Sequence, residues 1–261
     1  MSMAAFPVPE HEFYAFLLIG ARTGGLLTGT PILGNHSVPR QALAGLTIVF
    51  AMAVTPVLSV HTGPIPTNLI ALALLILQNG IIGLAIGYFT MLLFAAVKIA
   101  GFFIDTQMGF GIVNLLDPFS QQQSSIMAAF QYQTAITLYF ILNGPLLLLG
   151  ALTRSFYVVP PDAVVGGIAH VDNMIPLLST MMELSFQLAL PAIGVLFLTD
   201  VGLGLIARAA PQINVFIVGM PAKIIMGLAT VAFLMPILGI VVGRILVGTS
   251  SGFTALLASL R

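Results

Sequence analysis

Long apolar stretches separated by short polar connections dominate this chain of 261 residues. They lie at about residues 13–33, 42–60, 68–97, 126–150, 174–207 and 213–248. Apolar runs of this length predict helices, because strands are usually shorter than about ten residues. A helix needs roughly 20 apolar residues to cross the hydrocarbon core of a bilayer. The pattern therefore predicts an all-α, multi-pass integral membrane-type protein, with a single helical domain over residues 1–261.

Three of these stretches are longer than one crossing requires. The stretches at 68–97, 174–207 and 213–248 hold 30, 34 and 36 residues. Each contains residues that can bend or interrupt a helix. These are Gly80, Gly83 and Gly87 in the first stretch, Pro191 in the second, and Pro221 and Pro236 in the third. A membrane tolerates a proline in a helix where neighbouring protein satisfies the freed backbone groups. We expect long, Pro- and Gly-kinked helical hairpins that pack against protein.

Glycines four residues apart recur in the apolar stretches. Gly25 and Gly29 form one such pair, and Gly83 and Gly87 form another. This spacing lets two helix backbones approach closely. The alternative is that glycine is simply common in membrane helices.

Composition narrows the class of function. The chain is 59% hydrophobic, only 6% charged and has zero net charge, whereas soluble domains carry roughly 25% charged residues. A membrane protein is therefore indicated, and binding to nucleic acid is not expected. The chain has no cysteine, and its four histidines lack a metal-ligand spacing. No serine-nucleophile or phosphate-loop motif is present. We expect no enzyme, no catalytic residue, no metal and no cofactor.

Charged residues within the apolar stretches are candidates for buried charges: Arg22, Glu183, Asp200 and Lys223. A charge in lipid costs about 2.5–3.5 kcal/mol on insertion scales, so these groups are expected to face protein or a water-filled cavity. Asp200 and Arg208 are eight residues apart, about 12 Å along a helix, and cannot pair directly. Two roles stay open, which are pairing between helices or subunits and a direct part in transport.

The connection DTQMGFGIVNLLDPFSQQQSS, residues 105–125, is unusual because it is half apolar. It is too short and too often interrupted by Gly109, Gly111 and Pro118 to be a further membrane span. An apolar loop is expected to contact protein or a channel instead of water. One interpretation is a movable apolar closure, and the other is a re-entrant loop buried against neighbouring helices.

The segment DVGLGLIARAAPQINVFIVGMPAKIIMGL, residues 200–228, carries the most specific motif in the chain. Together with LLTGTPIL, VPRQALAGL and KIAGFFIDTQMGFGIVNLLDP, it resembles the FliR family of flagellar biosynthetic proteins over residues 13–248. The motif residues, which we expect to have structural or interface roles, are Arg208, Pro211, Gln212, Asn214, Phe216, Gly219 and Pro221.

The resemblance implies a core subunit of the flagellar type III protein export gate, in the inner (plasma) membrane at the flagellar basal body. Its implied partners are FliP and FliQ homologues in a closed helical assembly, the FlhB and FlhA homologues, membrane lipid, and unfolded flagellar proteins in transit. It also implies a channel plug within the central loop. The plug residues expected from the match are Gln107, Met108, Gly109, Phe110, Gly111, Asp117 and Pro118.

Two positions depart from the family pattern. Phe102 stands where the family often has Glu, and Pro145 stands where it often has His. Any role of that Glu or His cannot be transferred to this chain. The injectisome counterpart, which exports virulence proteins, is an alternative function. A secondary transporter for a small solute is another, motivated by the interrupted helices and by Arg22, Glu183 and Asp200.

Overall fold

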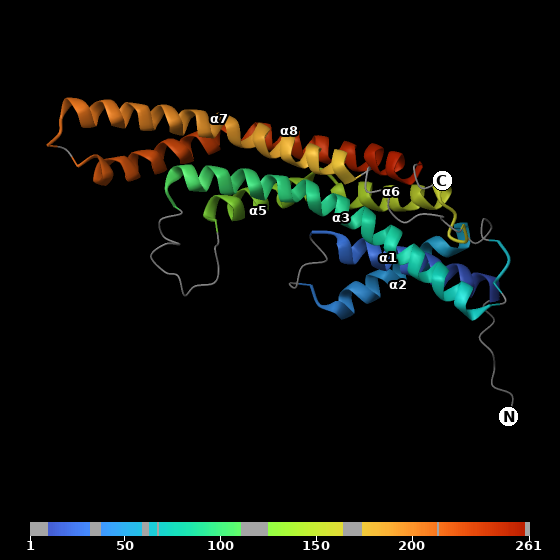
Figure 1. Cartoon of the computed structure of the whole chain (residues 1–261). Coiled ribbons are helices and arrows are strands. Elements are labelled where there is room, and N and C mark those ends of the chain that lie inside the picture. The colour runs from blue at the N-terminus through green and yellow to red at the C-terminus, as the bar shows by residue number, and fades with distance from the viewer. Residues whose placement is uncertain are drawn as a thin grey trace. The chain divides into compact units, whose positions relative to one another are not determined.

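The computed structural model describes residues 10–31, 38–58, 63–66, 68–110, 125–163, 174–212 and 214–258 (Figure 1). These residues form seven helices and no strand. The helices are α1 (Glu10–Gly29), α2 (Arg40–Leu58), α3 (Leu69–Met108), α5 (Ile126–Ile141), α6 (Gly144–Val158), α7 (Met174–Ala209) and α8 (Val215–Ala258). The predicted all-α fold class is confirmed.

Four of the described helices, α2, α3, α7 and α8, are long and apolar enough to cross a membrane, and the bent pair α5–α6 gives a fifth if it is one span. Helices α3, α7 and α8 contain 40, 36 and 44 residues. At a rise of 1.5 Å per residue they are about 60, 54 and 66 Å long, whereas a hydrocarbon core is about 30 Å thick. The multi-pass, membrane-type character is confirmed, and these three helices are far longer than a crossing requires.

Two features of the long helices differ from the sequence-based prediction. Helix α3 ends at Met108 instead of near residue 97, and the glycines at 80, 83 and 87 lie inside one continuous helix. The central loop therefore begins four residues later than predicted, because Asp105–Met108 belong to the last turn of α3. The prolines of α7 and α8 also lie inside continuous helices. These prolines each remove a backbone donor without ending the helix.

The stretch predicted at residues 126–150 is two helices, and the sequence at the break explains why. Asn143 has a φ of 56°, in the left-handed region, which Asn adopts more readily than most residues. A Cβ on Gly144 would overlap the ring of Tyr139. Pro145 stands in the first turn of α6, where its missing N–H is not needed. The sequence Asn143-Gly144-Pro145 therefore ends α5 and starts α6 in a new direction.

The described residues divide into two compact units. The first contains α1, α2, α3 up to Met91, α6 from Pro145 and the end of α8. The second contains α3 from Leu92, α5, α7 and α8 up to Leu246. Since α3 and α8 contribute to both units, neither unit is a continuous piece of sequence. The single-domain organisation stays a prediction.

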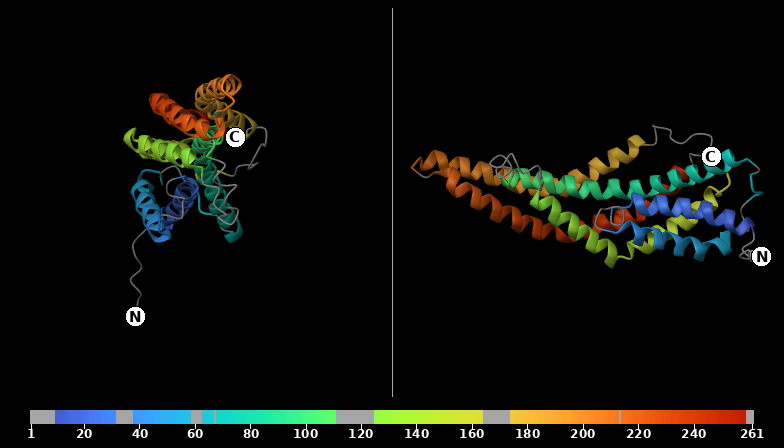
Figure 2. Two further views of the ribbon diagram at one scale, coloured as in Figure 1. Left: turned by 90° about the vertical axis from the view of Figure 1, so that its left-hand side faces the viewer. Right: turned by 90° about the horizontal axis from the view of Figure 1, so that it is seen from below.

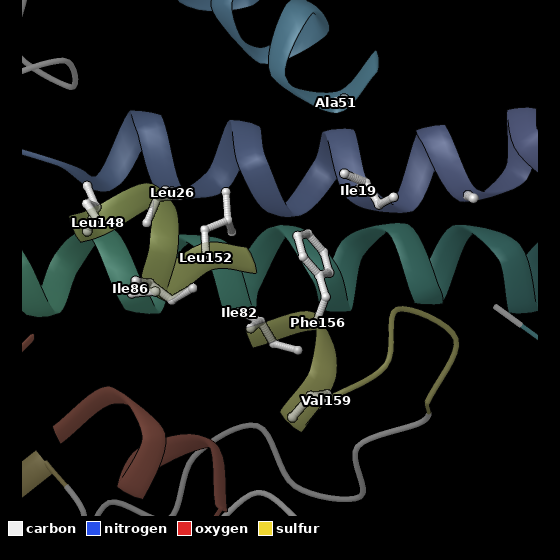
Figure 3. Packing of buried hydrophobic residues seen from close by; sticks show 11 residues of the cluster. Ile19, Leu26, Ala51, Ile82, Ile86, Leu148, Leu152, Phe156 and Val159 are labelled. Atoms are coloured by element: carbon white, nitrogen blue, oxygen red, sulfur yellow. The ribbon is translucent and has the colours of Figure 1, made fainter. Parts of the chain in front are cut away.

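In the first unit, α1, α3 and α6 enclose the hydrophobic core, and α2 adds Ala51 (Figure 3). Ile19 and Leu26 of α1 face Ile82 and Ile86 of α3. The contribution of α6 consists of Leu148, Ala151, Leu152 and Phe156. Because these side chains come from three helices, the core forms only when all three are docked.

Glycines allow α1 and α3 to approach at backbone distance. A Cβ on Gly25 would overlap the carbonyl of Gly80, and one on Gly83 would overlap the carbonyl of Arg22. A Cβ on Gly87 would lie 2.5 Å from the carbonyl oxygen of Leu26. The close approach expected from the paired glycines is therefore present, and no other residue fits at these positions without a shift of the backbone.

In the second unit, α7 and α8 form an antiparallel hairpin joined near residues 210–214 (Figure 2). Aromatic contacts fix α3 against its neighbours. The ring of Phe94 makes T-shaped contacts with Tyr132 and Tyr139 on α5, at 6.3 and 5.4 Å between ring centroids. Phe103 stacks on Phe186 of α7 at 5.7 Å. Such pairs add packing energy beyond the area they bury.

The glycine contact can be tested with two matched alanine variants. We expect Gly83→Ala to lower the apparent melting temperature in detergent, because overpacking a closed contact costs about 1–3 kcal/mol or more. Gly45→Ala in α2 is the control, since no atom lies within 4 Å of the added Cβ. There the alanine should stabilise the helix by up to about 1 kcal/mol. Equal melting temperatures for the two variants would contradict the close packing of α1 on α3.

Candidate functional site

The end of α3 carries the described part of the predicted plug. Gln107 is half-buried and Met108, the last residue of the helix, is fully buried. Gly109 has a φ of +89°, a conformation that favours glycine and ends helices. Its N–H donates to the carbonyl of Thr106, and the N–H of Phe110 donates to that of Asp105, both at 3.2 Å. The other predicted plug residues, Gly111, Asp117 and Pro118, lie outside the described residues.

Met108 is held by α8. A Cβ on Gly227 would lie 2.6 Å from Cγ, 2.7 Å from Sδ and 2.8 Å from Cε of Met108. The thioether therefore lies directly against a backbone that only glycine leaves open. Met108 packs between α3 and α8 within this chain, and its predicted part in a channel plug stays a prediction.

A second contact joins α3 to the start of α5. The side chain of Asp105 is buried, and its Oδ1 accepts a hydrogen bond of 3.2 Å from the N–H of Met127. Ser125 caps the same helix end by accepting from the N–H of Ala128 at 3.1 Å. One turn earlier on α3, a Cβ on Gly101 would overlap the backbone of Ala128. Sequence reasoning missed Asp105 and Gly101; Ser125 before an apolar run was the available signal for the helix start.

Arg22, on α1 of the first unit, is fully buried. Its Nε donates to Oδ1 of Asn79 at 2.9 Å, and its Nη1 donates to the carbonyl of Val159 at 2.9 Å. The same Nη1 donates to the carbonyl and Oγ of Ser155 at 3.1 and 3.3 Å. The guanidinium also lies over the ring of Phe156, 4.6 Å from its centroid. The partners of Arg22 therefore lie on α3, on α6 and at the residue that follows α6.

The acceptors of Arg22 are neutral, and the network continues beyond it. Asn79 donates from Nδ2 to the carbonyls of Leu75 and Pro161 at 2.8 and 2.7 Å. Asn79 therefore accepts from the arginine while it donates to the backbone that follows α6. Dipoles and an aromatic face, instead of a carboxylate, stabilise the buried cation.

Asp200 and Lys223 form an ion pair across the α7–α8 hairpin. The Nζ of Lys223 lies 2.7 Å from Oδ1 of Asp200, and the two side chains are 21% and 39% exposed. Asp200 precedes the last residue of α7 by nine positions, and Lys223 follows the first residue of α8 by eight. An antiparallel hairpin places two such positions at the same height. The similar distances of Asp200 and Lys223 from the turn were the signal in the sequence that could have predicted this ion pair.

Glu183 is a correction to the predicted set of buried charges. Its side chain is exposed on α7 and its Oε1 accepts a hydrogen bond from Nε2 of Gln187 at 3.0 Å. The two residues are four apart on one helix face, which is the ordinary arrangement of polar neighbours on a helix surface. The surrounding apolar sequence did not reveal which face of α7 the chain itself covers.

The FliR-like motif residues gather at the turn of the hairpin. Arg208 lies in the last turn of α7, where a cation suits the helix dipole, and Pro211 follows the helix end. Asn214 caps α8, because its Oδ1 accepts from the N–H groups of Phe216 and Ile217 at 3.1 and 3.4 Å. Gly219 is buried, and a Cβ there would lie 3.1 Å from Leu203 of α7.

Four of the motif residues are not explained by the turn alone. Gln212, Pro221 and Arg208 have exposed side chains, and Phe216 is 66% exposed. Phe102, at the position that departs from the family pattern, is likewise exposed on α3. Large exposed apolar side chains in a membrane-type chain are available to lipid or to a partner subunit.

Within the described part of the chain, no group of three or more His, Asp or Glu side chains is placed to hold a metal ion.

Comparison with known proteins gives one family and several relatives. Residues 13–248 match the family described as bacterial export proteins, family 1. The chain is 32% identical over 236 residues to the flagellar biosynthetic protein FliR of Bacillus subtilis, which covers 89% of this chain and 90% of that protein. It is 33% identical over 221 residues to FliR of Escherichia coli, covering 83% and 82%. It is also 35% identical over 161 residues to Yop proteins translocation protein T of Yersinia pestis, covering 61% and 62%.

The Asp200–Lys223 pair can be tested with a double-mutant cycle. We expect Asp200→Leu and Lys223→Leu each to reduce accumulation in the membrane, because a lone charge in an apolar setting costs about 2.5–3.5 kcal/mol. The double variant, and the exchange of the two residues, should restore most of the native level. If the pair were in water, each single change would cost about 1 kcal/mol or less. Native accumulation of both single variants would therefore contradict an apolar setting.

Proposed function

The chain belongs to the bacterial export proteins, family 1, and we propose that it is the FliR-type subunit of a flagellar type III protein export gate. The match over residues 13–248 carries this proposal. The resemblance to the FliR family that the motifs indicate is confirmed. As a family member, the chain is a membrane-embedded component of an export apparatus that works with other subunits.

The flagellar assignment is favoured over the injectisome by the extent of the matches. The two flagellar relatives align over 82–90% of their lengths. The injectisome relative from Yersinia pestis aligns over 62% of its length. The injectisome is the second candidate function, because that relative has a comparable identity of 35%. Neighbouring flagellar genes would separate the two, and neighbouring virulence-secretion genes would favour the injectisome.

The proposed partners are homologues of FliP and FliQ, with the FlhB and FlhA homologues in the same apparatus and unfolded flagellar proteins as cargo. The proposed location is the inner membrane at the flagellar basal body. Two observations support partners around this chain. Helices α3, α7 and α8 are about twice as long as a bilayer crossing needs, and the motif residue Phe216 is 66% exposed, which leaves it available to a partner.

The positions of the charged side chains remove the main argument for a small-solute transporter. Arg22 is hydrogen-bonded to protein groups, and Asp200 is paired with Lys223. Glu183 is exposed on the surface of α7. None of the three therefore stands unpaired in a cavity as a substrate or proton carrier would. Within this proposal the subunit is a structural part of a channel and not an enzyme.

We propose that the residues after Gly109 provide an apolar closure of the export channel. Hydrophobic constrictions can close a channel by excluding water. Gly109 supports the proposal, because its positive φ ends α3 where the apolar connection leaves the helix. Of the residues expected in the plug, Met108 is assigned to the anchor instead, since its side chain packs on Gly227.

Deletion of residues 111–116 tests this closure while it spares Met108. In cells that assemble the gate, we expect the deletion to increase ion leakage severalfold, measured as loss of membrane potential with a voltage-sensitive dye. The matched control deletes six residues from the other long connection, 164–169, and should leave the potential unchanged. The leak should also disappear in cells without the FliP homologue. If cells that assemble the deletion variant keep the native membrane potential, the proposed closure is wrong.

A further inference from the structure

Two charged side chains of the second unit are exposed and have no counter-ion within the described part of the chain. Lys98 on α3 and Glu183 on α7 both belong to this unit, and both are exposed. The ion pair among the described residues joins Asp200 to Lys223, so it neutralises neither of them. Both helices are apolar enough to cross a membrane. A single charge on such a helix is costly unless water or an opposite charge faces it.

Each of the two charges is held in place by a neutral neighbour. The Nζ of Lys98 lies over the ring of Tyr132 on α5, 4.2 Å from the ring centroid. The Oε1 of Glu183 accepts a hydrogen bond from Nε2 of Gln187 at 3.0 Å. An aromatic face attracts a cation without neutralising it, and a side-chain amide likewise leaves the carboxylate its charge. Because both side chains are already restrained, less conformational entropy is lost when a partner binds them.

The two opposite charges lie at similar heights along the helices. Phe103 of α3 stacks on Phe186 of α7 at 5.7 Å between ring centroids, which gives the two helices a common level. Both helices run in the same direction within this unit (Figures 1 and 2). Lys98 precedes Phe103 by five residues and Glu183 precedes Phe186 by three, which is about 7.5 and about 4.5 Å along the axes. The charges are therefore less than one helical turn apart in height.

Aromatic and other apolar side chains occupy the surface between these charges. The ring of Phe102 lies 6.4 Å from that of Phe103, which in turn stacks on Phe186. Phe102 and Phe186 are 49% and 45% exposed, and Met182 is 45% exposed. Residues three or four apart share one side of a helix, so Lys98 lies beside Phe102 and Glu183 beside Phe186. We call this surface the α3–α7 face, made of Lys98, Phe102, Met182, Glu183 and Phe186.

Neither lipid nor water suits all parts of the α3–α7 face. An anionic lipid headgroup would attract Lys98 but repel Glu183. Water would solvate both charges but would leave several large apolar side chains exposed side by side, which is typical of an interaction site. A protein surface with an apolar centre and one charge of each sign satisfies the whole face, because complementary charges across an interface attract each other.

We propose that the α3–α7 face is a docking surface for another subunit, which presents a carboxylate to Lys98, a basic side chain to Glu183 and apolar side chains to Phe102 and Phe186. This inference rests on the proposed function and deepens it, because it gives the chemistry of one partner surface in the export gate. The two charges, of opposite sign at one height, fix the orientation of the partner, since a reversed partner would place like charges together.

Site-directed photo-crosslinking in cells that produce the whole export apparatus tests this surface. The photoreactive amino acid p-benzoylphenylalanine would replace Phe102, and in a second variant Phe186, in the affinity-tagged full chain. Both positions should give adducts with the same partner subunit. Mass spectrometry of the crosslinked peptides should find an Asp or Glu close to the adduct at 102 and a Lys or Arg close to the adduct at 186.

Charge variants then test whether docking depends on the two charges. Lys98→Glu should reduce the adduct at 102 by about tenfold or more, because it would face the partner's carboxylate with a like charge. Lys98→Arg should retain the adduct. The matched control is Arg154→Glu, which reverses an exposed basic residue of the first unit and should also retain it. Changing the partner's crosslinked Asp or Glu to Lys should restore the adduct with Lys98→Glu.

The outcomes separate the docking surface from the gate itself. Retention of the FliP and FliQ homologues without an adduct at either position would overturn the docking surface alone. A charge-dependent adduct with an identified protein outside the export apparatus would support the surface and contradict the gate. An adduct with a second copy of this chain, or an undiminished adduct in Lys98→Glu, would overturn the surface. If Lys98→Glu does not accumulate, Lys98→Gln replaces it with a smaller expected loss, and failure of both to accumulate would also overturn the surface, since a docking residue is not needed for folding.

Discussion

The buried guanidinium of Arg22 sets the condition that the first unit must meet. Burying a cation is costly unless protein groups replace its hydration. The Nε of Arg22 donates to Asn79 on α3 and its Nη1 donates to Ser155 and Val159 at the end of α6, whereas Nη2 has no hydrogen-bond partner among the described residues. In the same unit α1 and α3 lie at backbone distance, which the glycines at 25, 83 and 87 permit. The second unit follows the same rule, since Asp200 meets Lys223 and Asp105 meets the start of α5.

The sequence predicted those features that depend on local pattern. Apolar runs predicted the helices, and paired glycines predicted a close helix contact, which α1 and α3 make. The sequence pattern did not predict which face of a helix is buried. It also did not predict contacts in which the partner residue lies far away in sequence. Glu183 is exposed although its neighbours are apolar. The role of Asp105 depends on a helix start 22 residues later, and that of Met108 on a glycine in α8, so neither appears in any local periodicity.

Motif and structure together divide the hairpin residues by role. Asn214 and Gly219 build the turn and the helix contact, so their identity follows from folding. Phe216 and Pro221 face outward, and their identity is better explained by neighbours outside the chain. The same division applies at the end of α3. Met108 and Asp105 hold the helix end, whereas the connection beyond Gly109 is the part proposed to close a channel.

Membership in an export gate is tested most directly by identifying the proteins that co-purify with the chain. The affinity-tagged chain would be purified in mild detergent from cells that produce the FliP and FliQ homologues at native levels. Mass spectrometry would then identify and quantify the proteins that remain bound. A gate subunit should retain both homologues in a fixed ratio through size-exclusion chromatography. Recovery of the folded chain without either homologue would contradict its place in the gate.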